Sequence, residues 1–227
     1  MMPAARVLAL DLPGSGTLHG ERSPGTVHGM MERTRQHLAM QDVSAPYCLL
    51  GLSLGAMVCV DWAAAHPHEI EACALLSTSL RPFSPFYERL RPRNYLAILR
   101  LALFERDPAA REATILRLTS SRPDAVAQLA ATWARFARER PVLRTNALRQ
   151  LAAAARYRAP AHAPSVPVLL LAGARDRLVD LRCSEALARS WNAPIAVHPA
   201  AGHDLALDDG AWVAAQVKAW IERLRRT

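Results

Sequence analysis

Short apolar runs alternate with segments of helical periodicity along this chain, and that alternation limits its possible folds more than any other feature. Five apolar runs end in glycine or turn residues, as buried parallel strands do. They comprise residues 6–10, 47–52, 72–76, 168–172 and 195–198. Helical patterns occupy residues 26–40, 54–65, 181–190 and 212–224. Strands that alternate with helices in this way predict an α/β fold with a doubly wound, mainly parallel sheet.

Residues 82–163 interrupt the alternation. The segment is rich in Ala, Leu and Arg, has a helical pattern and shows no strand-like run. Its turns are marked by Asp107-Pro108, Arg122-Pro123 and Arg140-Pro141, because a residue that precedes proline disfavours the helical conformation. We therefore expect a sheet-forming core in two parts, residues 1–81 and 164–227, with residues 82–163 inserted between them as a helical cap.

The strongest local signal is the pentapeptide Gly51-Leu52-Ser53-Leu54-Gly55, which follows a predicted strand and precedes a predicted helix. This G-x-S-x-G pattern in a strand–turn–helix context is typical of a nucleophilic serine on a sharp turn. Small flanking residues let the backbone turn tightly, and the start of the following helix favours negative charge. Ser53 is therefore the expected nucleophile, and the alternative is a small-residue packing turn. Met57, in the same predicted helix, is a candidate substrate contact.

A serine nucleophile needs a base and an acid that orients the base. Asp176 follows the predicted strand at residues 168–172, and His203 follows the predicted strand at residues 195–198. Because the carboxyl ends of parallel strands share one edge of the sheet, both side chains are expected on the same rim as Ser53. The chain order Ser, Asp, His is also the order used by α/β folds that carry this serine motif.

Each of these assignments has an alternative. Asp176 could cap a turn with Arg177 as its ion-pair partner, in which case Asp180 would be the acid. His203 could be a solvated loop histidine, and Asp204 is expected to be a loop or cap residue. The other histidines lack a strand-end glycine, so they are expected at the surface or behind the site: His19, His28, His37, His66, His68, His162 and His198.

Together these motifs resemble the α/β-hydrolase superfamily over residues 7–79 and 164–224. The matching motifs are Asp11-Leu12-Pro13-Gly14, the pentapeptide around Ser53, Gly173-Ala174-Arg175-Asp176 and Gly202-His203. Within the superfamily, the chain is similar to small capped serine esterases, including those that act on acyl carrier protein methyl esters. The resemblance implies ester hydrolysis through an acyl-enzyme, with the backbone N–H of Leu54 as an oxyanion donor and with no cofactor.

One departure from the superfamily pattern concerns the amino terminus. Members normally have strands before the one predicted at residues 6–10, followed by a His-Gly-type loop whose backbone N–H is the second oxyanion donor. We expect an α/β-hydrolase core that lacks these first strands, and Met1-Met2 suggests a shortened chain or a misplaced start codon. Losing one donor typically lowers the rate by ~10²–10³. The alternative function is therefore a non-catalytic protein of this fold that binds a ligand or partner, and lyase or perhydrolase chemistry also fits the same site.

Positive charge is concentrated in the predicted cap. The chain has a formal net charge of +8. Residues 81–160 hold 16 arginines against six carboxylates, a net charge of +10, whereas the remaining residues hold 12 basic and 14 acidic side chains. Such a cap could attract an anionic substrate or an acidic carrier protein, although arginines on helices are more often only solvated. The arginines concerned are Arg89, Arg91, Arg93, Arg100, Arg111, Arg117, Arg135, Arg138, Arg140, Arg144 and Arg149.

Other classes of function have little support in the sequence. The four cysteines show no metal-ligand spacing, so we predict no metal and expect Cys48 and Cys73 to be buried free thiols. No apolar run approaches the ~20 residues that span a bilayer, and no nucleic-acid-binding motif occurs. The apolar segment 95–104 could line a channel for an acyl chain. We expect a cytoplasmic serine hydrolase of a small-molecule ester, thioester or acyl substrate, without nucleic-acid partners or membrane insertion.

Overall fold

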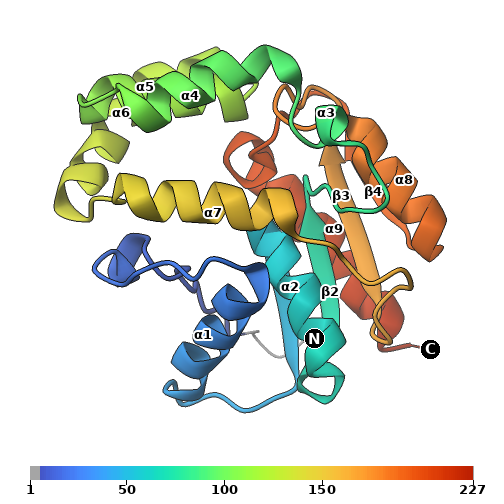
Figure 1. The fold of residues 1–227 in the computed structure, drawn as a ribbon. Coiled ribbons are helices and arrows are strands. Elements are labelled where there is room, and N and C mark those ends of the chain that lie inside the picture. The colour runs from blue at the N-terminus through green and yellow to red at the C-terminus, as the bar shows by residue number, and fades with distance from the viewer. Residues whose placement is uncertain (1–5, 227) are drawn as a thin grey trace.

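A parallel sheet forms the centre of the computed structural model, which describes residues 6–226 except for the side chains of residues 102, 123 and 125–127 (Figure 1). Its order is β1 (Tyr47–Leu52), β2 (Ile70–Leu76), β3 (Val168–Gly173) and β4 (Ile195–His198). The register pairs Leu52 with Leu76, Leu76 with Leu171, and Gly173 with His198, so the strands end along one edge. The sheet confirms the predicted fold class and four of the five predicted strands.

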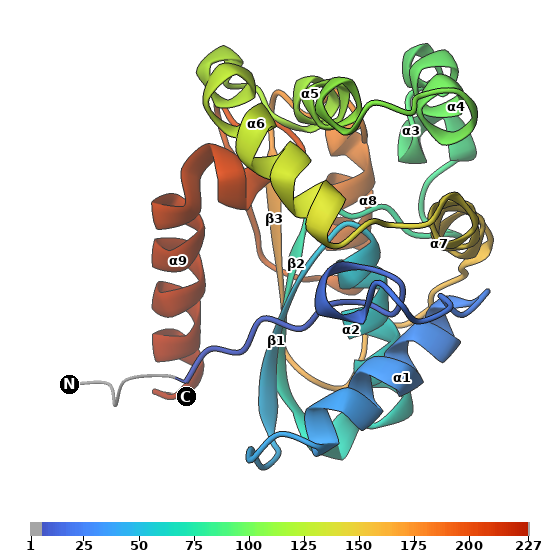
Figure 2. The same ribbon diagram turned by 90° about the vertical axis from the view of Figure 1, so that its left-hand side faces the viewer.

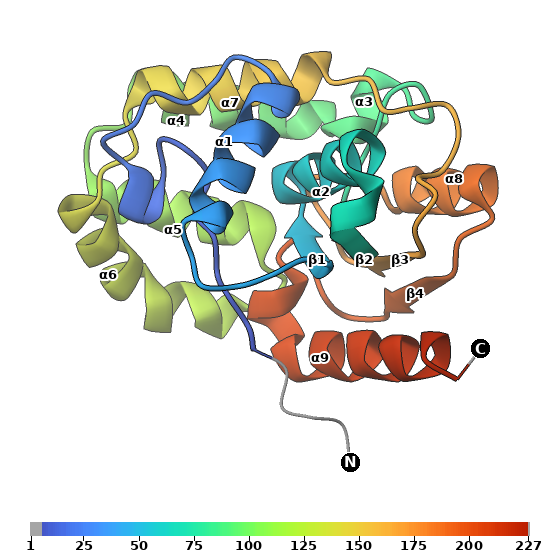
Figure 3. The ribbon, with the colours of Figure 1, turned by 90° about the horizontal axis from the view of Figure 1, so that it is seen from below.

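Helices cover both faces of this sheet (Figure 3). One face carries α1 (Val27–Ala39), α2 (Leu54–Ala65) and α8 (Leu181–Trp191), and the other carries α9 (Leu205–Leu224). Side chains of β2 alternate between the two layers: Cys73 and Leu75 pack in the cluster that contains α2, whereas Ala74 and Leu76 pack against α9. Because both faces of the strand are buried, its sequence is continuously apolar.

The helices of residues 82–163 follow β2 and precede β3 in the chain. They are α3 (Phe86–Arg89), α4 (Tyr95–Leu103), α5 (Pro108–Thr119), α6 (Pro123–Glu139) and α7 (Arg144–Arg156). Short 3-10 helices occur at Gly16–Leu18 (η1), Pro67–Glu69 (η2) and Pro92–Asn94 (η3). Figures 1 and 2 show α4 to α7 above the edge where the strands end. Two of the proline signals mark helix starts, and Asp107 caps α5 by accepting hydrogen bonds from the N–H groups of Ala109 and Ala110 at 3.1 Å.

The final helix begins earlier than its predicted start at residue 212. Asp204 is the N-cap, as its carboxylate accepts a hydrogen bond from the N–H of Leu207 at 3.1 Å. A kink at Asp209 (φ −154°, ψ 77°) interrupts the helix, and the Asp209 side chain then accepts a hydrogen bond from the N–H of Trp212. This second cap explains why the periodic pattern starts at Trp212.

Two sequence predictions about the edge of the sheet are wrong. Residues 6–10 form no strand, because none of them pairs with β1 and Val7 remains 86% exposed. Cys48 is exposed rather than buried, since β1 has a neighbour on only one side among the described residues. The Met1-Met2 start lies outside the described residues. Among residues 6–226 no helix combines the length and apolarity needed to cross a bilayer.

Candidate active site

Ser53 lies on a strained turn between β1 and α2. Its backbone has φ 52° and ψ −110°, a conformation that L-residues rarely adopt, and its N–H donates to the carbonyl of Leu76 at 2.9 Å. A Cβ on Gly51 would lie 2.5 Å from the backbone of Gly55, so only glycine fits at Gly51. A Cβ on Gly55 would meet nothing within 4 Å. The turn therefore requires the first glycine of the motif on steric grounds, and not the second.

The N–H of Leu54 is the first of helix α2 and makes no backbone hydrogen bond among the described residues. Ser53, the N-cap residue, does not cap the helix with its side chain. The first turn of α2 therefore presents unpaired N–H groups and the positive end of the helix dipole next to the serine. Such a position suits a developing negative charge.

A buried hydrogen-bonded pair joins the two other predicted residues. Nδ1 of His203 lies 2.8 Å from Oδ2 of Asp176, and both side chains are only 5% exposed. The second oxygen of Asp176 accepts hydrogen bonds from the N–H groups of Leu178 at 2.8 Å and Val179 at 2.9 Å. These bonds fix the carboxylate, and its bond to Nδ1 leaves Nε2 as the free nitrogen of the imidazole.

The alternative acid, Asp180, does not fill this role. It caps α8 by accepting a hydrogen bond from the N–H of Arg182, and it forms an ion pair with the same arginine at 3.1 Å. The hydrogen bonds from Arg182 lower the pKa of Asp180 despite its partial burial. Asp176, rather than Asp180, is the carboxylate that contacts His203.

The loop that carries His203 is anchored to the turn between α5 and α6, a feature that the sequence did not reveal. The Asp208 carboxylate accepts hydrogen bonds from the N–H of Gly202 at 2.6 Å, from Ser120 Oγ at 2.5 Å, and from the N–H and Oγ of Ser121 at 3.0 and 2.9 Å. Burial raises the pKa of Asp208, but the hydrogen bonds from Ser120, Gly202 and Ser121 outweigh burial and lower it. No local motif marks Asp208, since its donors lie as far as 88 residues away.

Ser53 lies where two cavities meet. A cavity of about 340 Å³ is bounded by Ser53, Met57, Phe86, Arg89 and Tyr95, among others. A second cavity of about 380 Å³ includes Ser53, Leu54, Leu101, Arg111 and Ile115 in its wall. Ile98 of α4 and Leu151 and Ala154 of α7 line both. The walls are mainly apolar, and no carboxylate lines either cavity among the described residues.

A family model described as the alpha/beta hydrolase family matches residues 3–216 of the sequence. The chain belongs to this family. Membership of the alpha/beta hydrolase family supports hydrolysis as the class of reaction. A search of curated proteins found no match.

Solved structures share the hydrolase fold over nearly the whole chain. A bacterial membrane phospholipase A has a TM-score of 0.75 at 23% identity, over 96% of this chain and 70% of that one. An esterase from Thermogutta terrifontis has a TM-score of 0.67 at 20% identity, over 94% and 78% of the two chains. An esterase from Rhodococcus has a TM-score of 0.69 at 17% identity, over 93% and 78%. At these identities the likeness is one of fold.

Among the described residues of this hydrolase, two of the cap arginines named above line the cavities at Ser53. Arg89 donates hydrogen bonds to the carbonyls of Ala154 and Ala155, at the end of α7, and burial lowers its pKa. Arg111 lies partly buried in the second cavity, and its guanidinium makes no hydrogen bond or ion pair among the described residues. Arg111 also attracts Glu112, but burial outweighs that attraction and raises the pKa of Glu112.

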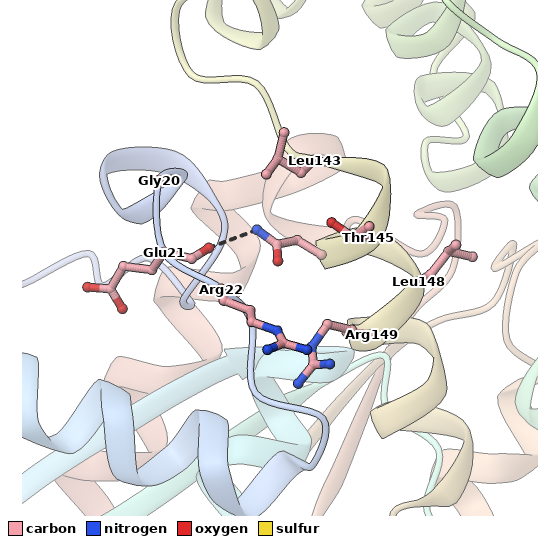
Figure 4. Close-up of a pocket in the computed structure, with 8 residues that line it drawn as sticks. Gly20, Glu21, Arg22, Leu143, Thr145, Leu148 and Arg149 are labelled. Carbon is pink, nitrogen blue, oxygen red and sulfur yellow. Dashed lines mark hydrogen bonds between the residues drawn. The ribbon is translucent and has the colours of Figure 1, made fainter.

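Helix α7 also holds the loop that contains the Asp11-Leu12-Pro13-Gly14 motif. The Asn146 side chain donates to the carbonyl of Glu21 at 2.8 Å. It lies at a pocket of about 570 Å³ that Glu21, Arg22 and Arg149 also line (Figure 4). The Asn146 carbonyl oxygen accepts from the N–H of Ser23, and the Gln150 amide donates to Ser15 Oγ at 3.1 Å. This pocket contains none of the three predicted catalytic residues. The hydrogen bond from the Gln150 amide holds Ser15 in the wall of the second cavity, which Ser53 also lines.

Among residues 6–226 no group of three or more His, Cys, Asp and Glu side chains is arranged to hold a metal ion. Cys59, Cys73 and Cys183 are buried, and desolvation raises the pKa of Cys59 to about 12 and that of Cys183 to about 11. These thiols are held in the unreactive protonated form.

Proposed function

We propose that this hydrolase cleaves carboxylic esters, or thioesters, through a covalent acyl-enzyme on Ser53. The observation that carries the proposal is the buried His203–Asp176 pair. Asp176 follows β3 and His203 follows β4, at the same edge of the sheet as the strained turn of Ser53. A buried imidazole held by a fixed carboxylate is the arrangement that activates a hydroxyl nucleophile.

In the proposed reaction, Ser53 Oγ attacks the acyl carbonyl as His203 Nε2 takes its proton. The N–H of Leu54 donates to the oxyanion that forms on the carbonyl oxygen. His203 then returns the proton to the leaving alcohol or thiol, and Asp176 stabilises the imidazolium between these steps. In the second half, water attacks the acyl-enzyme while His203 takes its proton. His203 then returns that proton to Ser53 Oγ as the acyl–Oγ bond breaks and the carboxylic acid leaves.

The cavities support an apolar substrate with an anionic group. One cavity would hold the acyl chain and the other would hold the leaving group. Met57 would contact whichever of these two groups occupies the cavity that it lines, beside α2. Arg111 favours a carboxylate or phosphate in the second cavity, because a partly buried cation without a hydrogen-bond partner gains from a charged acceptor. A carrier-linked acyl group fits the same requirements. The structural neighbours described as esterases and a phospholipase agree with ester cleavage.

A fluorophosphonate probe tests the proposal, together with turnover of short-chain p-nitrophenyl esters. Wild-type protein should become labelled and hydrolyse the esters, and Ser53→Ala should abolish both. Ser79→Ala is the matched control, because Ser79 lines the same cavity and should leave labelling intact. Folded protein that is neither labelled nor active would contradict the proposal and favour a ligand-binding protein of the same fold.

A further inference from the structure

Helix α4 is apolar around most of its circumference but is not enclosed by the rest of the molecule. Its nine residues, YLAILRLAL, include one charged side chain, Arg100. A helix of this composition is normally buried on all sides. Here Tyr95, Ile98 and Leu101 line the cavities at Ser53, so only one side of the helix is used within the protein.

The opposite side of α4 faces solvent. Leu96 is 66% exposed, Leu99 51%, Leu103 44%, and Phe104, which follows the helix, 70%. The segment predicted to line an acyl channel therefore has two apolar faces, of which one lines the cavities and the other has no cover within the described residues.

Helix α3, which precedes α4 in the chain, also exposes aromatic side chains. Phe86 is 71% and Tyr87 50% exposed. Figures 1 and 2 show α3 and α4 at the end of the molecule farthest from the strand starts. We call Phe86, Tyr87, Leu96, Leu99, Leu103 and Phe104 the outer apolar surface. One member of this surface, Phe86, also lines the cavity that contains Ser53.

The charge around this surface is positive. Arg93 and Arg100 line a depression of about 560 Å³ together with Leu96 and Phe104. Neither arginine forms an ion pair with a carboxylate among the described residues, and Arg106 lies just beyond Phe104 in the chain. Of the acids nearby, Glu88 is paired with Arg182 at 3.3 Å, and Glu105, which also lines the depression, accepts a hydrogen bond from the N–H of Asp107 at 3.0 Å. Residues 81–160 carry a net charge of +10.

We propose that the outer apolar surface docks on an anionic lipid bilayer. Exposed apolar and aromatic side chains flanked by arginines suit the boundary between headgroups and acyl chains, where arginine reaches the phosphates while its stem remains in apolar surroundings. A second copy is a poorer occupant, because two caps of charge +10 repel each other. A lipid ester could pass from the bilayer into the cavity beside Phe86. That delivery rests on the proposed function, whereas the docking does not.

Cosedimentation with vesicles of phosphatidylcholine alone, and with 30% phosphatidylglycerol, tests the docking. Wild-type protein should bind the anionic vesicles at least about 10-fold more tightly than the neutral ones, and high salt should weaken the binding. The double variant Leu96→Ser/Phe104→Ser and the double variant Arg93→Gln/Arg100→Gln should each lose about 10-fold or more in affinity. Val7→Ser/Met40→Ser is the matched control, since it removes two exposed apolar side chains that lie outside residues 82–163.

Several outcomes would overturn the proposal: no binding to anionic vesicles, binding that the apolar variant retains, or equal loss in the control. Concentration-dependent dimerisation that Leu96→Ser/Phe104→Ser abolishes would identify a second copy as the occupant instead. Thermal melts establish that each variant is folded. Fluorophosphonate labelling of the same samples separates the two proposals, because vesicle binding without labelling upholds the docking and contradicts the serine hydrolase.

Discussion

The two glycines of the serine motif have different physical roles. A methyl group on Gly51 would overlap the backbone of Gly55, which cannot move without displacing α2. We expect Gly51→Ala to lower the free energy of unfolding by about 2 kcal/mol or more. Gly55→Ala meets open space within α2 and should change stability by no more than about 1 kcal/mol. Urea unfolding of the two variants measures the difference, and equal destabilisation would contradict this account.

Asp176 and Asp180 are a second pair of similar residues in different roles. In Asp176→Asn the amide can no longer stabilise an imidazolium at His203, so kcat for ester hydrolysis should fall by about 10³–10⁴. Asp180→Asn alters the cap of α8 and should leave kcat within a few-fold of wild type. Steady-state kinetics on one p-nitrophenyl ester compare them. A larger loss of kcat in Asp180→Asn than in Asp176→Asn would identify Asp180 as the acid instead.

Between elements, one carboxylate joins three parts of the fold. Glu69, at the end of η2, accepts hydrogen bonds from Arg35 of α1 at 2.6 to 2.9 Å and from Trp62 Nε1 of α2 at 2.9 Å. The hydrogen bonds from Arg35 are the largest cause that lowers the pKa of Glu69, from 4.5 to about 2. The folded state therefore stabilises the charged form of the Glu69 carboxylate. Protonation of this carboxylate weakens the link between α1 and the sheet.

The pH dependence of stability follows from this shift. A carboxyl group whose pKa is lowered in the folded state stabilises the fold fully when the pH is above its unfolded-state pKa. This stabilisation is lost as the pH falls through the folded-state pKa. The difference in unfolding free energy between wild type and Glu69→Gln should be largest above about pH 5 and should shrink steadily as pH falls toward 2. Urea unfolding across this range measures it, with the exposed Glu71→Gln as control. A difference that is independent of pH would refute the electrostatic link.

Elements whose ends carry local signals could be predicted closely from the sequence. The predicted bounds of β1, α2 and β4 are those of the structure, because strand ends and helix starts are marked locally by glycine and turn residues. Residues 6–10 have the composition of a strand, but composition does not reveal whether a neighbouring strand is present. The exposed Cys48 and the apolar outer side of α4 have the same explanation, since burial depends on the neighbours of an element.

The candidate site likewise contains residues that could be predicted from the sequence and one that could not. Ser53, Asp176 and His203 could be selected because each follows a strand of a parallel sheet, where position along the chain predicts position in space. The role of Asp208 depends on Ser120 and Ser121, and only the folded structure brings those segments together.

For the molecule as a whole, the position of the positive charge says more about the preferred substrate than the net charge does. Arg111 is the cap arginine that lies in a Ser53 cavity with an unpaired guanidinium among the described residues. We expect Arg111→Gln to lower kcat/KM about 10-fold for a p-nitrophenyl ester whose acyl chain ends in a carboxylate, with little change for a neutral ester of equal length. Added salt should weaken the preference for the anionic ester in wild type.

The comparison needs a matched arginine. Arg117 lies on the same helix, is exposed and lines neither cavity, so Arg117→Gln should keep the wild-type ratio of the two esters. Equal ratios in wild type and both variants would show that the cap arginines are only solvated charges.

The meeting of two cavities at one serine has a consequence for what becomes of the acyl group. On the proposed mechanism, the leaving group vacates one cavity while the acyl chain still fills the other. The vacated walls, with Leu101 and Ile115 or with Phe86 and Tyr95, are apolar and favour an alcohol over water. Hydrolysis and transfer of the acyl group to an added alcohol would then compete for one intermediate, and the shape of the empty cavity would set the ratio of acid to new ester among the products.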